Sequence, residues 1–238
     1  MSEALRVLMI LTSHATMGEG GEPTGVWFEE LATPYYAFRD AGAEVRVVSI
    51  EGGPVPIDPR SRKQKGENPA SVERFLADAY AVRSIEFSAK VTDVSAAGYD
   101  IVFLPGGHGT MWDLPRSEAL TRLVSEAWQG GAVVSAVCHG PAGLVNARDP
   151  AGRPIVQGRR VSAFTDSEER AAGLTEKVPF LLETRLRELG ARFEGGPDFQ
   201  SFAVRDGRLV TGQNPASSAE VARLALEAAR DRTAAPAA

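Results

Sequence analysis

The sequence of 238 residues has little cysteine and histidine, with one cysteine and three histidines. A single cysteine excludes a disulfide within the chain, which fits a reducing compartment. No apolar run approaches the roughly 18 residues that indicate a membrane-spanning helix. The apolar start at 6–13 is short, follows Glu3 and lacks a cleavage site, so we interpret it as a buried strand and not as an export signal. We therefore expect a cytoplasmic protein with no membrane partner.

A strong excess of one charge is also missing, since 26 basic and 31 acidic residues give a net charge of −5. A short basic run at 60–65 contains no aromatic side chain, so it predicts a solvated loop and not a nucleic-acid surface. Apolar residues make up 43% of the chain, enough for the core of one large α/β domain. We expect no nucleic-acid partner.

Apolar runs of strand length alternate with helical patterns along most of the chain. Strands that are apolar on both faces, with helices between them, are typical of a mostly parallel sheet covered on both sides. The expected strands cover 6–13, 44–50, 99–107, 132–137 and 208–212, and the expected helices cover 28–42, 118–131, 178–190 and 215–231. The sequence therefore predicts an α/β fold with a mostly parallel sheet.

Residues 51–98 interrupt this rhythm with a stretch rich in glycine, proline and charge, followed by one helical pattern at 72–87. Sites in open α/β sheets form at the carboxyl edge of the strands. We expect this segment to be an insertion that covers that edge as a lid, and not a separate domain. The whole chain, 1–238, is then a single domain with a frayed tail at 232–238.

The only cysteine stands next to a histidine, as Cys138-His139, where the strand 132–137 passes into a helix. Small residues two positions before and two after Cys138 are what a nucleophile elbow requires. The start of a helix also favours a thiolate. A lone cysteine is more often an inert buried side chain, but its position, its neighbour and its flanking residues favour a nucleophile here.

A glycine turn, "LPGGHGTMWDL" at 104–114, ends the preceding strand and should lie beside Cys138. The amides of Gly106 and Gly107 could donate to an oxyanion there, and an ordinary tight turn is the alternative. His108 either lines the pocket or caps the turn, and the sequence leaves both possibilities open.

Two acidic groups are candidates for the same edge. Glu29 and Glu30 begin the helix after the first strand, and because about 100° of helix separates them only one can turn fully inward. A second group follows a further expected strand, with Asp166, Glu168 and Glu169. One of these three could hold the His139 imidazole and complete a nucleophile–base–orienter arrangement. Solvated surface charge is the alternative for each of them.

At these residues the chain resembles a known family. The segments are "AVCHGPA", "LPGGHGTMWDL", "TGVWFEEL" with "TPYYAF", "FTDSEE" and "LVTGQNPASS". Together they resemble the PfpI-like branch of the class I glutamine-amidotransferase-like superfamily, and within it the glutathione-independent glyoxalase (glyoxalase III) and heat-shock chaperone group. The similarity runs in order through nearly the whole chain. It implies a flavodoxin-like three-layer sandwich that is usually a homodimer.

The resemblance also implies roles for individual residues. Cys138 matches the nucleophile and His139 its neighbour, while Glu30 matches the buried acid of the first helix. Glu169 best matches the residue that orients the histidine, with Glu168 and Asp166 remaining possible. A zinc site of some relatives needs a histidine soon after the "TG" turn, where this chain has apolar residues at 26–28. We therefore expect no metal and no cofactor.

The implied function is conversion of methylglyoxal or a related 2-oxoaldehyde to a 2-hydroxy acid through a cysteine hemithioacetal. A protein deglycase would use the same residues, and a holding chaperone would use exposed aromatic side chains. A cysteine peptidase or amidase is a weaker alternative. No histidine follows His139, which argues against a glutamine amidotransferase. The aromatic residues that a chaperone surface could use are Trp27, Tyr35, Tyr36, Phe75, Trp112 and Trp128.

Overall fold

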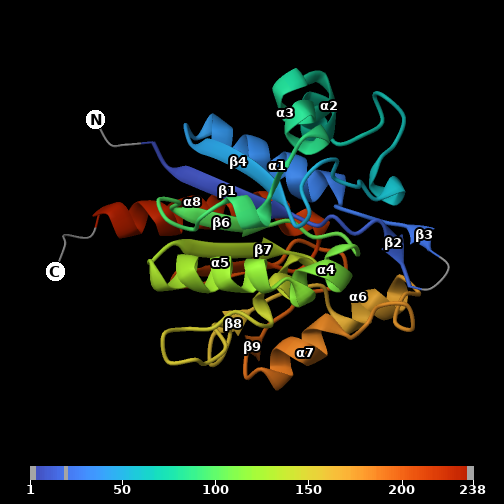
Figure 1. Ribbon diagram of the computed structural model, residues 1–238. Coiled ribbons are helices and arrows are strands. Elements are labelled where there is room, and N and C mark those ends of the chain that lie inside the picture. The colour runs from blue at the N-terminus through green and yellow to red at the C-terminus, as the bar shows by residue number, and fades with distance from the viewer. Residues whose placement is uncertain (1–3, 19–20, 235–238) are drawn as a thin grey trace.

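A seven-stranded sheet forms the centre of the computed structural model, which describes residues 4–18 and 21–234. Its strand order is β10-β11-β7-β6-β1-β4-β5 (Figure 1). Every neighbouring pair is parallel except β10 and β11. The strands are β1 (Arg6–Leu11), β4 (Glu44–Ser49), β5 (Ala89–Lys90), β6 (Ile101–Leu104), β7 (Val133–Val137), β10 (Ala203–Asp206) and β11 (Leu209–Gly212). The predicted mostly parallel sheet is confirmed, and the antiparallel edge strand β10 was not foreseen.

Helices cover both faces of this sheet. Successive side chains of a strand point to opposite faces, and in β1 Leu8 and Met9 belong to two different buried clusters. The cluster around Met9 includes side chains of α1 (Phe28–Asp40) and α8 (Ser218–Ala234). The cluster around Leu8 includes side chains of α5 (Glu118–Gln129) and α7 (Leu182–Glu188). The three layers are those of the flavodoxin-like sandwich.

The segment 51–98 contains two short helices where one was predicted. Asp78 separates α2 (Ala70–Ala77) from α3 (Ala79–Glu86), because its backbone is extended and its carboxylate accepts hydrogen bonds from the N–H groups of Tyr80 and Ala81. Both helices lie beside α1 and not over the carboxyl edge (Figure 1). Only the first part of the segment, with η1 (Pro59–Ser61), lies against the turn before α1, where the Val26 N–H donates to the Pro56 oxygen.

Smaller elements complete the described chain. They are β2 (Thr16–Met17), β3 (Glu22–Pro23), η2 (Val91–Asp93), α4 (Thr110–Asp113), η3 (Leu114–Arg116), η4 (Gly140–Leu144), β8 (Arg160–Val161), α6 (Asp166–Ala171), β9 (Arg192–Phe193) and η5 (Pro215–Ser217). The last helix continues to Ala234, past its predicted end at 231, and the rest of the predicted frayed tail, 235–238, lies outside the described residues. Among the residues described, no helix has the length and apolar character needed to cross a membrane.

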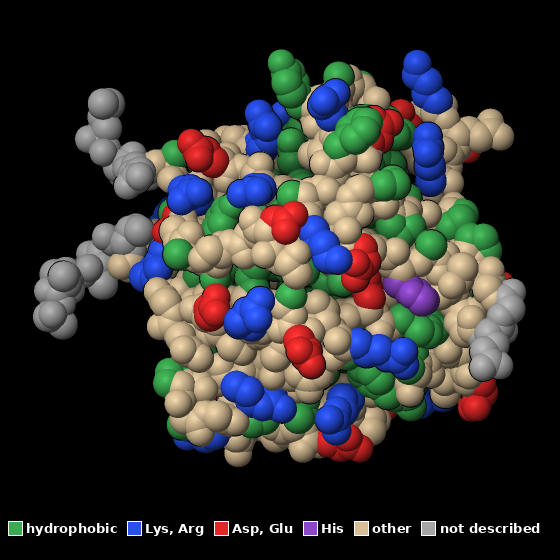
Figure 2. All heavy atoms as spheres, viewed as in Figure 1, with side chains coloured by type: hydrophobic (Ala, Val, Ile, Leu, Met, Phe, Trp, Pro, Cys, Tyr) green, Lys and Arg blue, Asp and Glu red, His purple; other side chains and the backbone are tan. Residues whose placement is uncertain are grey.

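Basic and acidic side chains are interspersed on the face of the molecule shown in Figure 2. No large patch of one charge is visible on that face. A nucleic-acid surface depends on clustered positive charge, and this face has no such cluster.

Candidate active site

Cys138 stands at a sharp turn between β7 and η4, in the left-handed backbone region with φ of +59°. Few residues other than glycine adopt this conformation, and where they do the surrounding structure has to hold it. Here the Cys138 N–H donates to the Gly212 oxygen at 2.9 Å, and its own oxygen accepts from the Phe164 N–H at 2.8 Å. A β-carbon at Gly140 would lie 2.1 Å from the Leu104 oxygen, so the turn needs glycine at that position.

His139 connects the cysteine to a carboxylate. Its Nδ1 lies 3.3 Å from the Cys138 sulfur, and its Nε2 lies 2.7 Å from Oε2 of Glu169. A carboxylate only accepts hydrogen bonds, so Nε2 carries the proton and Nδ1 presents a lone pair to the thiol. Burial alone would raise the pKa of Glu169, but the two neighbouring histidines hold it well below its usual range. The carboxylate is therefore charged and able to stabilise a protonated His139.

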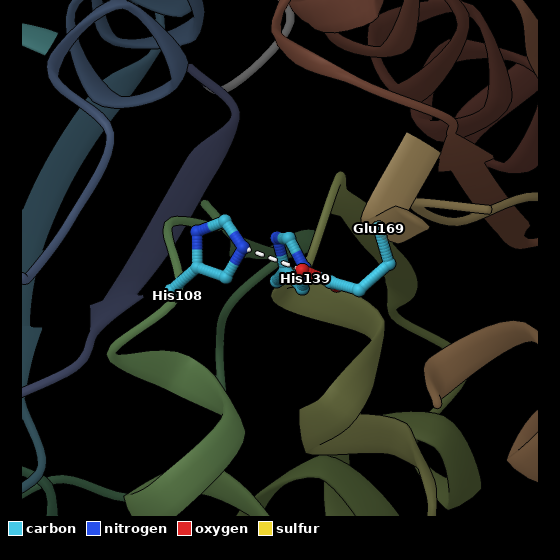
Figure 3. Close-up of side chains that lie close together, drawn as sticks. All are labelled: His108, His139 and Glu169. Carbon is cyan, nitrogen blue, oxygen red and sulfur yellow. Dashed lines mark hydrogen bonds and ion pairs between the residues drawn. The ribbon is translucent and has the colours of Figure 1, made fainter. Parts of the chain in front are cut away.

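His108 is hydrogen-bonded to the other oxygen of the same carboxylate (Figure 3). Its Nε2 is 2.9 Å from Oε1 of Glu169, and its ring centroid is 4.1 Å from that of His139. Burial, and then the charge that His139 can carry, lower the pKa of His108 to about 4. Of the two possibilities left open by the sequence, the structure places His108 within the site as a neutral ring.

Glu30 lies beside Cys138 with its side chain fully buried. Its Oε2 accepts a hydrogen bond from the Gly106 N–H at 2.8 Å, and a β-carbon at Gly106 would lie 2.7 Å from that same oxygen. Burial raises the pKa of Glu30 to about 8, and the neighbouring Cys138 side chain and the Gly106 N–H oppose this rise by favouring the charged form. Glu30 is therefore mostly protonated at neutral pH, and it is the member of the pair with Glu29 that faces inward.

The Gly106 N–H is therefore already hydrogen-bonded to Glu30 and is not free to donate to an oxyanion. Within the described residues, the Gly107 N–H donates to no acceptor, and the His139 N–H points to the Cys138 sulfur. These two amides are the candidates left for donating to a charged oxygen that forms beside Cys138. The structure does not support Gly106 as an oxyanion donor, because its N–H is bonded to Glu30, and the role expected of Gly107 stays a prediction.

The expected thiolate at Cys138 is also corrected. Burial, followed by the neighbouring Glu30 carboxyl group, raises the pKa of the Cys138 thiol well above its ordinary value. The helix that begins at this turn, η4, has only five residues and so a weak dipole. The raised pKa keeps the proton on the sulfur, and the nearest group that could accept this proton is Nδ1 of His139, at 3.3 Å.

The three acidic candidates of "FTDSEE" have separate environments, and only Glu169 contacts His139. Glu168 caps α6: its carboxylate accepts hydrogen bonds from Thr165, from the Phe199 N–H at 2.7 Å and from Asn214 Nδ2 at 2.8 Å. Asp166 accepts a hydrogen bond from the Thr184 hydroxyl at 2.6 Å, away from the site.

Sequence reasoning missed two residues that contact the histidines. The ring of Phe164 lies 4.4 Å from that of His139, centroid to centroid. Arg60, part of the basic run predicted to be a solvated loop, approaches Nδ1 of His108 at 3.2 Å through Nη2. The only signal for Arg60 was its place in a segment expected to lie over the site.

His108, His139 and Glu169 bring three potential metal-ligand atoms within 4.8 Å of one another. Both oxygens of Glu169, however, accept hydrogen bonds from histidine N–H groups, and the free nitrogen of His139 faces the cysteine. A metal would have to displace this complete set of hydrogen bonds, so we assign none of the three as metal ligands. The expected absence of a metal stays a prediction.

Comparison with known proteins gives related sequences over nearly the whole chain. The model of the DJ-1/PfpI family matches residues 24–228. The glutathione-independent glyoxalase hsp3101 of Schizosaccharomyces pombe is 35% identical, with 95% of this chain and 97% of that protein covered. Glyoxalase 3 of Candida albicans is 33% identical, with 92% and 95% covered.

Solved structures agree with these sequence matches. The crystal structure of glyoxalase III from Candida albicans has a TM-score of 0.86 and 30% identity, and covers 94% of this chain and 97% of that one. Rapid Encystment Protein 24 kDa of Francisella tularensis has a TM-score of 0.90 and 37% identity, with 94% and 99% covered.

Proposed function

The chain belongs to the DJ-1/PfpI family, and we propose that it is a glutathione-independent glyoxalase of the glyoxalase III type. It converts methylglyoxal, or a related 2-oxoaldehyde, and water into a 2-hydroxy acid, which is lactate in the simplest case. One observation carries this proposal: the Cys138 sulfur lies 3.3 Å from the unprotonated nitrogen of His139, beside a carboxylic acid at Glu30. The relatives named as glyoxalases cover almost the entire chain, which supports the same reaction.

In the first step the thiol adds to the aldehyde. The Cys138 proton moves to Nδ1 of His139 while the sulfur bonds to the aldehyde carbon, and Glu30 gives its proton to the aldehyde oxygen. The product is a hemithioacetal, with a charged His139 and a Glu30 carboxylate. Glu169 stabilises the imidazolium that forms, and the Gly107 and His139 amides stabilise charge on the oxygen.

The second step moves hydrogen from the aldehyde carbon to the ketone carbon. Glu30 removes the proton from the carbon bonded to sulfur, and His139 protonates the ketone oxygen, which gives an enediol. Glu30 then returns its proton to the second carbon, while His139 removes the proton from the first hydroxyl. One carbon is oxidised and its neighbour reduced, so a thioester forms without an external oxidant, and we expect no redox cofactor.

Water completes the cycle. It bonds to the thioester carbon and gives a proton to Glu30, while the sulfur leaves with the proton of His139. The 2-hydroxy acid is released, and Cys138, His139 and Glu30 return to their starting protonation states. The cysteine supplies the thiol itself, so glutathione has no role in the reaction.

The aromatic residues named for a holding chaperone give that function little support, and the large apolar side chains that are exposed in the described chain are instead Tyr80, Phe87 and Phe199. Most of the aromatic residues that could have formed an exposed surface are buried, with Tyr35, Tyr36, Phe75 and Trp128 each at 5% exposure or less. A deglycase would use the same groups on a related adduct and remains the alternative reaction. The homodimer and the cytoplasmic location, which rest on the resemblance and on the composition, remain predictions.

The test is to incubate the pure protein with methylglyoxal without glutathione and to follow loss of the aldehyde and appearance of lactate. We expect turnover by the wild-type chain and a loss of at least about a thousandfold in Cys138→Ala, because the covalent route needs the sulfur. The substitution removes one small side chain, and thermal unfolding should show that the variant still folds. Retained turnover in this variant would disprove the proposed route.

A further inference from the structure

Arg60 of η1 begins a continuous chain of hydrogen-bonded side chains that ends at Cys138. The links run from Arg60 to His108, from His108 to Glu169, from Glu169 to His139 and from His139 to the sulfur. We propose that Arg60 is a positioning residue, which holds His108 neutral with its proton on Nε2 and so keeps the charge of Glu169 available to His139. The kinetic consequences rest on the proposed glyoxalase function, whereas the state of His108 does not.

The direction of each hydrogen bond follows from the groups at the two ends of the chain. A guanidinium only donates, so Nδ1 of His108 must accept from Nη2 of Arg60, at 3.2 Å. The Glu169 carboxylate only accepts, so Nε2 of His108 must donate to it, at 2.9 Å. His108 therefore has one possible arrangement, a neutral ring with its proton on Nε2. His139 has the same arrangement on the other carboxylate oxygen.

Asp58 holds the guanidinium in place. The carboxylate of Asp58 is fully buried, and it accepts hydrogen bonds from Nε of Arg60 at 3.0 Å, from Nη2 at 2.6 Å and from the Thr24 hydroxyl at 2.9 Å. Burial would raise the pKa of Asp58, but the hydrogen bonds from Arg60 lower it below its usual value. The side chain of Arg60 is 41% exposed, so its orientation depends on this buried partner and not on general packing.

The neutrality of His108 matters because its ring lies 4.1 Å from that of His139. Once His139 has taken the thiol proton, a second charged ring at this distance would repel it and would compete for Glu169. Arg60 opposes that charge in two ways: its N–H occupies the Nδ1 lone pair, and its positive charge disfavours another nearby.

The other charged groups around His108 do not replace Arg60. Glu169 and His139 face its ring from α6 and from the start of η4, while Asp58 reaches it only through Arg60. Glu22 of β3 acts on Arg60 and is paired with Lys177. Of these groups, Arg60 is the one whose hydrogen bond reaches the Nδ1 lone pair of His108.

Removing Arg60 should therefore change the pH profile of the enzyme. In Arg60→Leu, His108 can take a proton at Nδ1. As the pH is lowered, the variant should therefore lose activity at a higher pH than the wild type does. We expect the acid midpoint of kcat/KM to rise by about one pH unit, so that kcat/KM measured below the wild-type midpoint falls about tenfold. KM should stay unchanged, because Arg60 contacts no reacting atom in this proposal.

A double variant separates this effect from a merely structural one. In Arg60→Leu/His108→Gln the amide can still donate to Glu169 but cannot take a proton. The acid midpoint should return to the wild-type value in the double variant. The exposed Arg62→Leu, two positions along the same loop, is the matched control and should leave the profile unchanged. An acid midpoint that does not move in folded Arg60→Leu would overturn the inference.

Two further measurements keep the inference testable. If Arg60→Leu fails to fold because Asp58 is left as an unpaired buried charge, Asp58→Asn/Arg60→Leu removes both charges and should show the same shift. NMR of the imidazole nitrogens is simple in a chain with three histidines. It should show His108 neutral and protonated on Nε2 down to about pH 5 in the wild type, and about half of the rings protonated on both nitrogens at that pH in the variant.

The NMR result does not depend on turnover. If the wild type fails to convert methylglyoxal, the proposed function is wrong, and the state of His108 still decides the role of Arg60. If the wild type is active and His108 titrates identically with and without Arg60, the inference is wrong and the function stands.

Discussion

Two glutamates that are adjacent in the sequence have different roles: one carboxylate stabilises the local structure and the other contacts the histidines of the site. Glu168 and Glu169 both lie in the first turn of α6 and are both buried. Glu168 turns back to cap its own helix and to hold the loop at Phe199 and Asn214, whereas Glu169 points toward the two buried histidines. The sequence places three acids in this turn, but only the direction of each side chain assigns their functions.

We expect Glu169→Gln to lower mainly the activity and Glu168→Gln to lower mainly the stability. In Glu169→Gln the amide NH2 meets a histidine N–H, which favours the wrong tautomer of His139, so kcat should fall by about a thousandfold. In Glu168→Gln buried donors lose their acceptor, so the free energy of unfolding should fall by about 1–3 kcal/mol while kcat changes less.

Turnover of methylglyoxal and urea unfolding of the two proteins measure these effects. A loss of activity of the same size in both variants would show that Glu169 acts only through the helix it shares with Glu168.

At the level of elements, the site depends on a close approach between two turns. Gly107, in the turn after β6, has φ of +104°, and a β-carbon there would lie 2.2 Å from the Gly25 oxygen in the turn before α1. This contact joins the turn that carries His108 to the turn that precedes Glu30. Glycine at 107 therefore sets the distance between two parts of the site.

We expect Gly107→Ala to lower the free energy of unfolding by more than about 3 kcal/mol, because the new methyl group overlaps the backbone as well as straining it. Gly66→Ala is the matched control, since Gly66 has φ of +90° and no atom within 4 Å of a β-carbon. Its cost should be about 1 kcal/mol, from the backbone conformation alone.

Urea unfolding of both variants gives the comparison. An equal loss of stability in the two proteins would mean that the turns are free to move apart.

Strongly periodic elements could be predicted from the sequence, and short ones could not. The central parallel strands are apolar runs, and their alternation with helices indicates parallel pairing, so the position of Cys138 after β7 could also be predicted. The edge strand β10 has four residues and little apolar character, and it is set by pairing with β11. Asp78 breaks a helical pattern through a local cap that periodicity does not reveal.

The approach of Arg60 to His108 depends on how the insertion folds back onto the site, which a sequence motif does not encode. The raised pKa of Cys138 was missed for a similar reason. The sequence shows a strand-to-helix junction, which favours a thiolate, but it does not show how completely the neighbouring elements bury the sulfur. Burial is a property of the assembled layers, and here it outweighs the local effect of the helix start.

The free energy of unfolding should depend on pH because Glu30 is buried in the folded protein. The pKa of Glu30 rises from an ordinary 4.5 to about 8 because the folded layers bury it. Between these values the folded state keeps a proton that the unfolded state releases, so the free energy of unfolding falls as the pH rises. His108 acts in the opposite direction, with a pKa lowered from 6.5 to about 4, so its contribution is lost as the pH falls below 6.5. The range from pH 6.5 to 8 therefore isolates Glu30.

We expect the wild-type protein to lose about 2 kcal/mol of unfolding free energy between pH 6.5 and 8 because of Glu30, measured by urea unfolding at half-unit steps. Glu30→Gln keeps an acceptor for the Gly106 N–H but has no proton to lose, so its stability should be nearly flat over that range. Glu29→Gln, at the neighbouring and less buried position, is the control and should keep most of the wild-type slope, because the charge of Glu29 raises the Glu30 pKa less than burial does. Equal slopes in all three proteins would show that Glu30 is already charged in the folded state, and the proton transfers assigned to it would then fail.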